Sequence, residues 1–182
     1  KLFRLDVIRR NKLRFDPRLK INEDVLFNLQ YLRFLLFLQK NSAIYCLAGV
    51  YYNQNDMLAG SLSRSLRGDL LDAEAVTRPV LEAFLTDAKL PAPEIDRLVQ
   101  ISRVRAALNQ YGLLTGCPGR MPFAQRRQLF VRILQDADAR AALRARLTAD
   151  PNRLLALPYR LGVFLHSAWL LAAYTQLKNR FL

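Results

Sequence analysis

A run of mostly apolar residues from Asn22 to Leu38 constrains the fold of this chain more than any other feature. Apolar side chains fall on nearly every face of a helix of this length, so the run predicts a helix that is buried in a core. Asn22 is the predicted N-cap. Glu23 and Asp24 follow in the first turn, where the helix dipole stabilises negative charge.

The composition of the chain is that of a globular protein. Hydrophobic residues make up 52% and charged residues 24% of the 182 residues, which excludes disordered and collagen-like classes. The 7 glycines and 8 prolines argue against a β-sandwich with many tight turns. Two distant cysteines, Cys46 and Cys117, and the single histidine, His166, are too few for a zinc site, so we expect free thiols in a reducing compartment.

Local patterns predict a mainly helical chain with few strands. The segment 43–52 is β-branched and aromatic, which is typical of a strand. Helical periodicity is predicted over the later regions, which are 66–111 with a break at Pro91-Ala92-Pro93, a stretch from Pro122 onward, 139–147, and a final helix after Pro158 that runs to Leu182. No uncharged apolar run reaches the about 18–20 residues of a membrane-spanning helix.

Five short motifs follow one another in the first 65 residues. They are Lys1-Leu2-Phe3-Arg4, Leu13-Arg14-Phe15-Asp16, Asn22-Glu23-Asp24-Val25-Leu26-Phe27-Asn28, Tyr51-Tyr52 and Ser61-Leu62-Ser63-Arg64-Ser65. In this order and spacing they resemble the second half of the catalytic domain of the family 2 glycosyltransferases. Those are inverting GT-A-fold enzymes of bacterial polysaccharide and cell-envelope synthesis.

The resemblance implies an α/β GT-A fold, the fold of nucleotide-diphospho-sugar transferases. This chain would be its C-terminal half, mainly α with few short strands and a helical C-terminal extension. Residues 1–65 are then the end of the catalytic domain, and residues 66–182 are the extension. In the family, a preceding half binds the nucleotide sugar and holds Mg²⁺ or Mn²⁺ through a D-x-D motif. No such half precedes Lys1, so we expect a missing upstream segment, metal ligands outside this chain, and no activity of this piece alone.

The resemblance also assigns the catalytic residues. Inversion needs a base that takes the proton of the acceptor hydroxyl as it attacks the anomeric carbon. By resemblance that base is Asp24, and Glu23 beside it orients the acceptor or the base. The alternative is that both acids only complement the helix dipole.

A loop after the predicted strand is expected to contact the substrate. The arginine that the family usually has there is replaced by Asn53-Gln54-Asn55. Arg64 or Arg67 would then supply positive charge to the leaving diphosphate, beside Ser61 and Ser63. The alternative is that Ser61, Ser63 and Asp69 simply cap the following helix.

The strong positive charge limits the classes of molecule that are expected to bind this chain. The chain has 28 Lys and Arg against 15 Asp and Glu, a net charge of +13, which favours nucleotide diphosphates, nucleic acid or an anionic membrane surface. One alternative function is therefore a basic helical nucleic-acid-binding domain, although no DNA-binding motif is recognisable. Its phosphate contacts would be Arg126, Arg127, Arg140, Arg144 and Arg146. A second alternative is a non-catalytic scaffold that pairs with a partner chain.

The segment from Leu161 to Tyr174 is mostly apolar and has basic residues on both sides. It predicts either a helix that lies in the interface of an anionic leaflet or one that packs on the core or at a dimer contact. With the resemblance, it suggests a cytoplasmic enzyme, peripheral at the inner face of the plasma membrane. The partners of such an enzyme would be a nucleotide sugar donor and a saccharide or lipid-linked acceptor. No specific nucleic acid is expected as a partner.

Two further features are interpreted as structural. Asp136-Ala137-Asp138 has the letters of D-x-D, but it lies in an alanine- and arginine-rich helical pattern and is interpreted as a solvated helix face. His166 has Phe164 and Leu165 as neighbours, so we expect it to be packed on an apolar helix.

Overall fold

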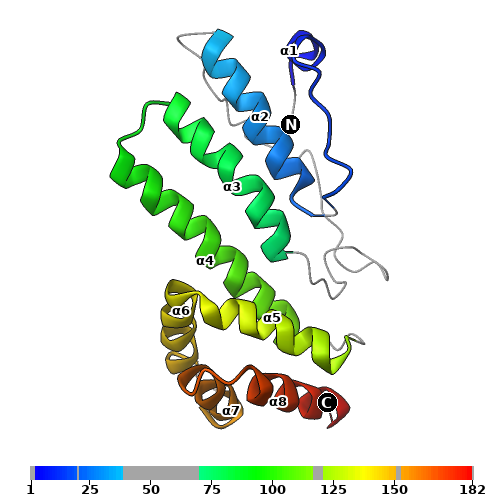
Figure 1. Cartoon of the computed structure of the whole chain (residues 1–182), viewed down its shortest axis with the longest axis vertical. Coiled ribbons are helices and arrows are strands. Elements are labelled where there is room, and N and C mark those ends of the chain that lie inside the picture. The colour runs from blue at the N-terminus through cyan, green and yellow to red at the C-terminus, as the bar shows by residue number, and fades with distance from the viewer. Residues whose placement is uncertain (1–2, 20, 39–69, 117–120, 151–152, 182) are drawn as a thin grey trace, which may run out of the picture. The chain divides into compact units, whose positions relative to one another are not determined.

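The computed structural model describes residues 3–19, 21–38, 70–116, 121–150 and 153–181 (Figure 1). Within these ranges the regular structure is helical and contains no strand. The helices are α1 (Leu5–Arg10), α2 (Glu23–Leu38), α3 (Leu70–Asp87), α4 (Ala92–Gly116), α5 (Phe123–Gln135), α6 (Ala137–Thr148), α7 (Arg153–Phe164) and α8 (Ala168–Phe181). The strand predicted at 43–52 lies outside the described residues.

Contacts divide the chain into two units. The N-terminal unit comprises the described residues of Lys1–Asn55 and Asp72–Ser102, and the C-terminal unit comprises those of Asp56–Leu71 and Arg103–Leu182. Residues 72–102, which we assigned to the helical extension, are therefore grouped with the N-terminal residues. The helix α4 contributes residues to both units.

The N-terminal unit is built around α2. Its buried cluster consists of Val7 from α1 with Phe27 and Tyr31 from α2. The backbone N–H of Arg4 donates to the Tyr31 hydroxyl at 2.8 Å, which fixes the chain entering α1 against α2. The helix α1 has only six residues, and the sequence patterns did not predict it.

The predicted helix 22–38 is present as α2, and it is buried only in part. It begins after Asn22, whose carbonyl accepts from the Leu26 N–H at 2.9 Å and whose φ is 62°. Val25, Leu36 and Phe37 are exposed, Phe37 to 67%. The helix is apolar on more faces than α1 and the segment before α2 can cover.

The helices α3 and α4 run antiparallel within the N-terminal unit (Figure 1). The turn between them is closed by a hydrogen bond from the Leu90 N–H to the Leu85 carbonyl, with Lys89 in the left-handed conformation (φ 60°). Pro93 lies in the first turn of α4, where a proline's missing N–H is not needed. An ion pair between Arg33 and Asp87 links α2 to α3.

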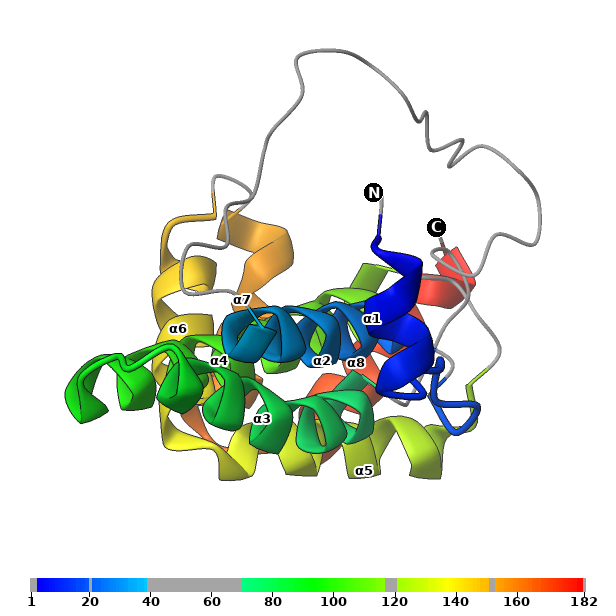
Figure 2. The same ribbon diagram turned by 90° about the horizontal axis from the view of Figure 1, so that it is seen from above.

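The C-terminal unit has one continuous hydrophobic core. Helix α5 packs against α6 and α8, and α7 packs against α6 and α8 (Figure 2). The most buried residues of this core include Phe130, Ile133, Leu143 and Leu171, each at most 1% exposed. The end of α4 closes the cluster with Leu114 and other buried residues.

The single final helix predicted after Pro158 is wrong, because two helices occupy this region. Pro158 lies inside α7, which ends at Phe164. His166 adopts a left-handed φ of 52°, which a continuing helix does not permit. Ser167 then caps α8, where its Oγ accepts from the Leu170 N–H at 3.2 Å.

The helices α7 and α8 approach each other closely at Gly162. A Cβ atom on this residue would lie 2.7 Å from the Cγ of Leu171, so only glycine fits there without displacement. None of the described helices combines the length and the apolarity needed to cross a bilayer.

Candidate functional site

Three of the five N-terminal motifs meet at the first turns of α2. The ring of Phe27 contacts Phe3 edge-on, with the centroids 5.3 Å apart, and stacks on Phe15 at 4.7 Å. Phe3 also contacts Tyr31 at 4.9 Å. Each of Phe3, Phe15 and Phe27 comes from a different motif, so residues far apart in the sequence form one aromatic cluster.

The two candidate catalytic acids open α2 beside this cluster. Asp24 is exposed, and its Oδ1 accepts from the Val25 N–H at 2.8 Å. Glu23 is half-buried. Among the described residues neither carboxylate forms an ion pair. The Asp24 carboxylate is thus held at the helix start and is accessible to a substrate hydroxyl.

Helical spacing separates the directions of the two acids. Asp24 lies on the same stripe of α2 as Phe27 and Tyr31, which are three and seven positions later. Glu23 lies on the stripe of Gln30 and Phe34, seven and eleven positions later. The two acids therefore face different surroundings, although they are adjacent in the sequence.

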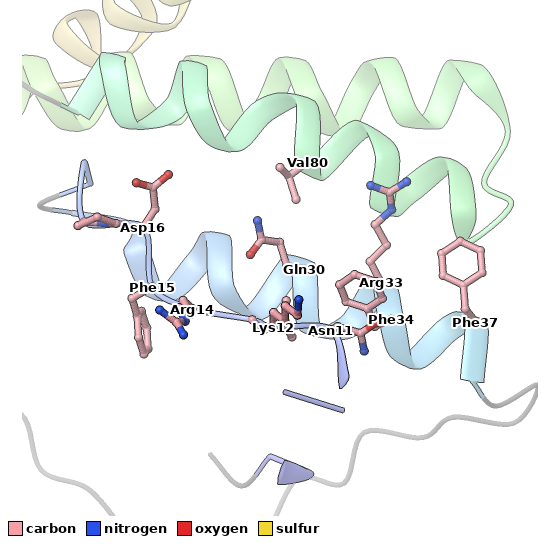
Figure 3. A pocket seen from close by; sticks show the side chains of 12 residues that line it. Asn11, Lys12, Arg14, Phe15, Asp16, Gln30, Arg33, Phe34, Phe37 and Val80 are labelled. Carbon is pink, nitrogen blue, oxygen red and sulfur yellow. The ribbon is translucent and has the colours of Figure 1, made fainter. Parts of the chain in front are cut away.

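The Glu23 stripe leads into a cleft of about 700 Å³ (Figure 3). Residues 11–17, α2 and Val80 of α3 form its walls. In Figure 3 the side chains of Gln30 and Arg33 extend from α2 toward α3. The lining combines aromatic and polar groups, namely Asn11, Lys12, Arg14, Phe15, Asp16, Gln30, Arg33, Phe34 and Phe37. Such a mixed lining can bind a polar molecule through hydrogen bonds and ring contacts.

Positive charge predominates in this cleft. Arg18 donates from its backbone N–H and its guanidinium to Asp16 at 2.6–3.2 Å, and these bonds lower the pKa of Asp16 to about 2. Arg33 pairs with Asp87. Lys12 and Arg14 are exposed, and among the described residues no acid pairs with them. The cleft thus suits a neutral or anionic ligand better than a cation.

The Asp136-Ala137-Asp138 segment is not the solvated helix face that we expected. Asp136 is the N-cap of α6, with Oδ1 accepting from the N–H groups of Asp138 and Ala139 at 3.0 Å. Arg103 pairs with Asp136 at 2.8 Å and with Asp138 at 2.7 Å. Asp136 could have been predicted as an N-cap from the sequence, because it directly precedes an alanine-rich helical pattern.

The described residues contain no group of three or more side chains that could hold a metal ion. The predicted substrate contacts Ser61, Ser63, Arg64 and Arg67 lie outside the part of the chain that the structure describes.

The expectation for His166 is wrong, and one phosphate contact of the nucleic-acid alternative is buried. His166 is exposed rather than packed, because it occupies the turn between α7 and α8, and its Nε2 lies 3.3 Å from the Nη2 of Arg144. Arg126 is only 4% exposed, and burial lowers its pKa. It therefore cannot contact phosphates together with Arg127, which is exposed on the same helix.

Comparisons with protein-family models, with curated proteins and with solved structures give no match for this chain.

Proposed function

We propose that this chain is the acceptor-side part of an inverting glycosyltransferase, which transfers a sugar from a nucleotide sugar to an acceptor hydroxyl in bacterial polysaccharide or cell-envelope synthesis. The observation that carries the proposal is the convergence of Phe3, Phe15 and Phe27 on the start of α2, with the Asp24 carboxylate exposed beside them. The convergence supports the idea that these motifs act as one site.

In the proposed reaction Asp24 is the general base. Its carboxylate takes the proton of the acceptor hydroxyl while the hydroxyl oxygen attacks the anomeric carbon from the face opposite the diphosphate. The bond from the anomeric carbon to the diphosphate oxygen breaks, and its electron pair stays on the diphosphate. The half-buried Glu23 orients the acceptor.

The leaving diphosphate needs positive charge. Arg64 and Arg67 are proposed to supply part of it. The ligands of the proposed Mg²⁺ or Mn²⁺ are placed outside this chain because the resembled family holds the ion through a D-x-D motif in the preceding half. When it is bound, such an ion neutralises charge on the diphosphate.

The cleft next to α2 is proposed to bind the acceptor saccharide. It begins on the stripe of α2 that carries Glu23, and the side-chain amides of Asn11 and Gln30 lie in its wall. Amides both donate and accept hydrogen bonds, which is what sugar hydroxyls require. Gln30→Leu is expected to raise the KM for the acceptor and to leave kcat nearly unchanged. A decrease in kcat as large as the increase in KM would contradict this placement of the acceptor.

The base assignment is tested in the longest form of the protein that shows transfer activity. Asp24→Asn is expected to lower kcat by about 10²–10⁴-fold with the donor KM nearly unchanged, because only proton transfer is lost. Glu82→Gln, which removes another exposed acid of the same unit, is the matched control. Wild-type turnover of Asp24→Asn would refute the assignment and favour the scaffold alternative.

The placement of the donor site is tested with the 182-residue chain itself. Calorimetry with a nucleoside diphosphate and Mn²⁺ is expected to show no tight binding. A micromolar, metal-dependent affinity would show that the nucleotide site lies in this chain, which contradicts the acceptor-side proposal.

The nucleic-acid alternative has less support. Arg126 is buried, and Arg140 donates to the Leu134 carbonyl, so two of its five proposed phosphate contacts have structural roles. Steeply salt-dependent binding to random duplex DNA would favour this alternative over sugar transfer.

A further inference from the structure

Helix α7 has a second apolar face that the core does not use. Leu157, Leu161, Phe164 and Leu165 are 49%, 46%, 68% and 62% exposed. Their spacing of four, three and one positions places them along one side of the helix, at and just beyond its C-terminal end. We call these four residues the α7 ridge.

The opposite side of α7 already completes the hydrophobic core. Ala156, Tyr159 and Val163 are at most 7% exposed, and Tyr159 packs edge-on against Tyr111 and Tyr174. The core of the C-terminal unit therefore does not need the α7 ridge. Four large apolar side chains that remain about half exposed or more on one helix mark an interaction surface.

Two arginines lie at the border of the α7 ridge and are held there. The guanidinium of Arg144 lies over the Phe164 ring, 5.6 Å from its centroid. Arg160 precedes Leu161 and donates to the carbonyls of Leu147 and Thr148, at 2.8 Å and 3.1 Å, at the C-terminal end of α6.

The charged side chains that the structure places against the ridge, Arg144 and Arg160, are both basic. After Asp150 the sequence contains four Lys and Arg and no Asp or Glu. An apolar ridge flanked by two arginines favours an occupant that is apolar and anionic at once.

A second copy of this chain does not meet that need. In a two-fold contact each ridge would face the other, and Arg144 and Arg160 of one copy would approach the same two arginines of the other. A lipid bilayer with anionic headgroups meets both requirements, because its acyl region accepts protruding apolar side chains without a matching pocket. Its phosphates can also pair with arginine.

We propose that the α7 ridge docks on the surface of an anionic lipid bilayer. Leu161, Phe164 and Leu165 enter the boundary between headgroups and acyl chains, and Arg144 and Arg160 contact lipid phosphates. Helix α7 then lies along the membrane plane and does not cross it. This inference does not depend on the proposed glycosyl transfer.

The chain contains its own reporter for this interaction. Trp169 is the single tryptophan and is 60% exposed in the first turn of α8. Vesicles that contain phosphatidylglycerol are expected to co-sediment the chain and to shift its tryptophan emission to the blue, and pure phosphatidylcholine vesicles are not. Raising the salt from about 0.1 M to about 1 M should weaken binding, because the Debye length falls from about 10 Å to about 3 Å.

Variants then distinguish vesicle binding through the α7 ridge from nonspecific vesicle binding. Leu161→Gln with Phe164→Gln is expected to weaken binding by at least about tenfold. Leu177→Gln should leave vesicle binding unchanged, because Leu177 is an exposed leucine of α8 outside the ridge. Arg144→Glu is expected to weaken it about tenfold while the apolar ridge is intact. Circular dichroism checks that each variant keeps its helices.

Quenching of Trp169 by brominated lipid in the unaltered chain gives a readout that needs no variant. The proposal is overturned if the chain binds neutral vesicles equally well, if the ridge double variant binds as the unaltered chain does, or if no quenching accompanies co-sedimentation. Salt-resistant dimers that the ridge variant dissociates would also overturn it, in favour of a protein interface.

Discussion

Among the residues that the structure describes, the two units differ in the size of their buried hydrophobic cluster. In the C-terminal unit, fifteen buried residues form one cluster. In the N-terminal unit, the cluster has three, Val7, Phe27 and Tyr31. Both units are helical, so the difference does not come from secondary structure. It shows that a helix apolar all round, such as α2, requires more cover than the described N-terminal residues provide, whereas α5 to α8 cover one another.

Both units contain buried polar groups, which in the N-terminal unit include Glu74 and Thr77. In the C-terminal unit the buried Thr175 donates to the Leu171 carbonyl at 2.7 Å and lies 3.4 Å from the Tyr159 hydroxyl. Gln110 accepts from the Leu70 N–H at 3.3 Å, and burial raises the pKa of Tyr159 and Tyr111. Buried polar partners of this kind favour one packing arrangement over others. From the larger buried cluster we expect the C-terminal unit to unfold cooperatively and the N-terminal unit to open more easily.

The largest expected effect tests this contrast directly. Phe130→Ala empties a site that is fully buried in α5, and it should lower the free energy of unfolding by about 3–5 kcal/mol. Denaturant unfolding followed by Trp169 fluorescence measures it. Phe27→Ala should leave that transition in place and speed only hydrogen exchange in α2. Equal shifts from the two variants would contradict the contrast.

The close approach of α7 and α8 gives the next largest effect. Gly162→Ala should cost about 1–3 kcal/mol, because its Cβ would overlap Leu171. Gly112→Ala is the matched control in α4, where no atom lies within 4 Å of the new Cβ, and it should stabilise the helix by about 1 kcal/mol. Thermal unfolding of both variants measures these changes in stability. Destabilisation by both would show that the close contact at Gly162 does not cause the loss of stability.

Two aspartates at helix starts give a smaller effect that separates structure from function. Asp136→Ala removes the cap of α6 and a partner of Arg103, so it should lower the free energy of unfolding by about 1–2 kcal/mol. Asp24→Ala should cost less, about 0.3–1 kcal/mol, because its exposed carboxylate accepts only the Val25 N–H and complements the helix dipole. If both variants lose equal stability in denaturant titrations, Asp24 has a capping role.

The smallest expected effect concerns pH. Bonds from Arg18 lower the pKa of Asp16 to about 2, below its usual value of about 3.9. The folded form then gains stability above about pH 4, and this gain is lost as the pH falls toward 2. Carboxyl NMR titration should show an apparent pKa for Asp16 near 2, which returns toward 3.9 in Arg18→Ala. An unchanged titration in that variant would rule out the pair as the cause.

The sequence predicts the helices of this chain better than it predicts their ends and surroundings. The periodicity of α2 and the break before α4 follow from apolar spacing and proline. The turn at His166 was missed, because a left-handed histidine has no apolar signature and Ser167 was not recognised as a cap.

The candidate site was predictable only as a set of motifs. Their letters and order suggested a common site, but the contacts of Phe3 and Phe15 with Phe27 depend on tertiary packing, which no local pattern encodes. The cleft was not predicted for the same reason, since it lies between residues 11–17, α2 and Val80.

Four non-glycine residues among those described have left-handed backbones, with φ values of 51–62°. They are Lys12, Asn22, Lys89 and His166. A lysine or histidine in this conformation is strained by about 1 kcal/mol relative to glycine. Lys89 lies two residues after α3 and His166 two residues after α7, and neither is among the candidate catalytic residues. The chain therefore has room for thermostable variants that replace these two residues with glycine and leave the proposed chemistry untouched.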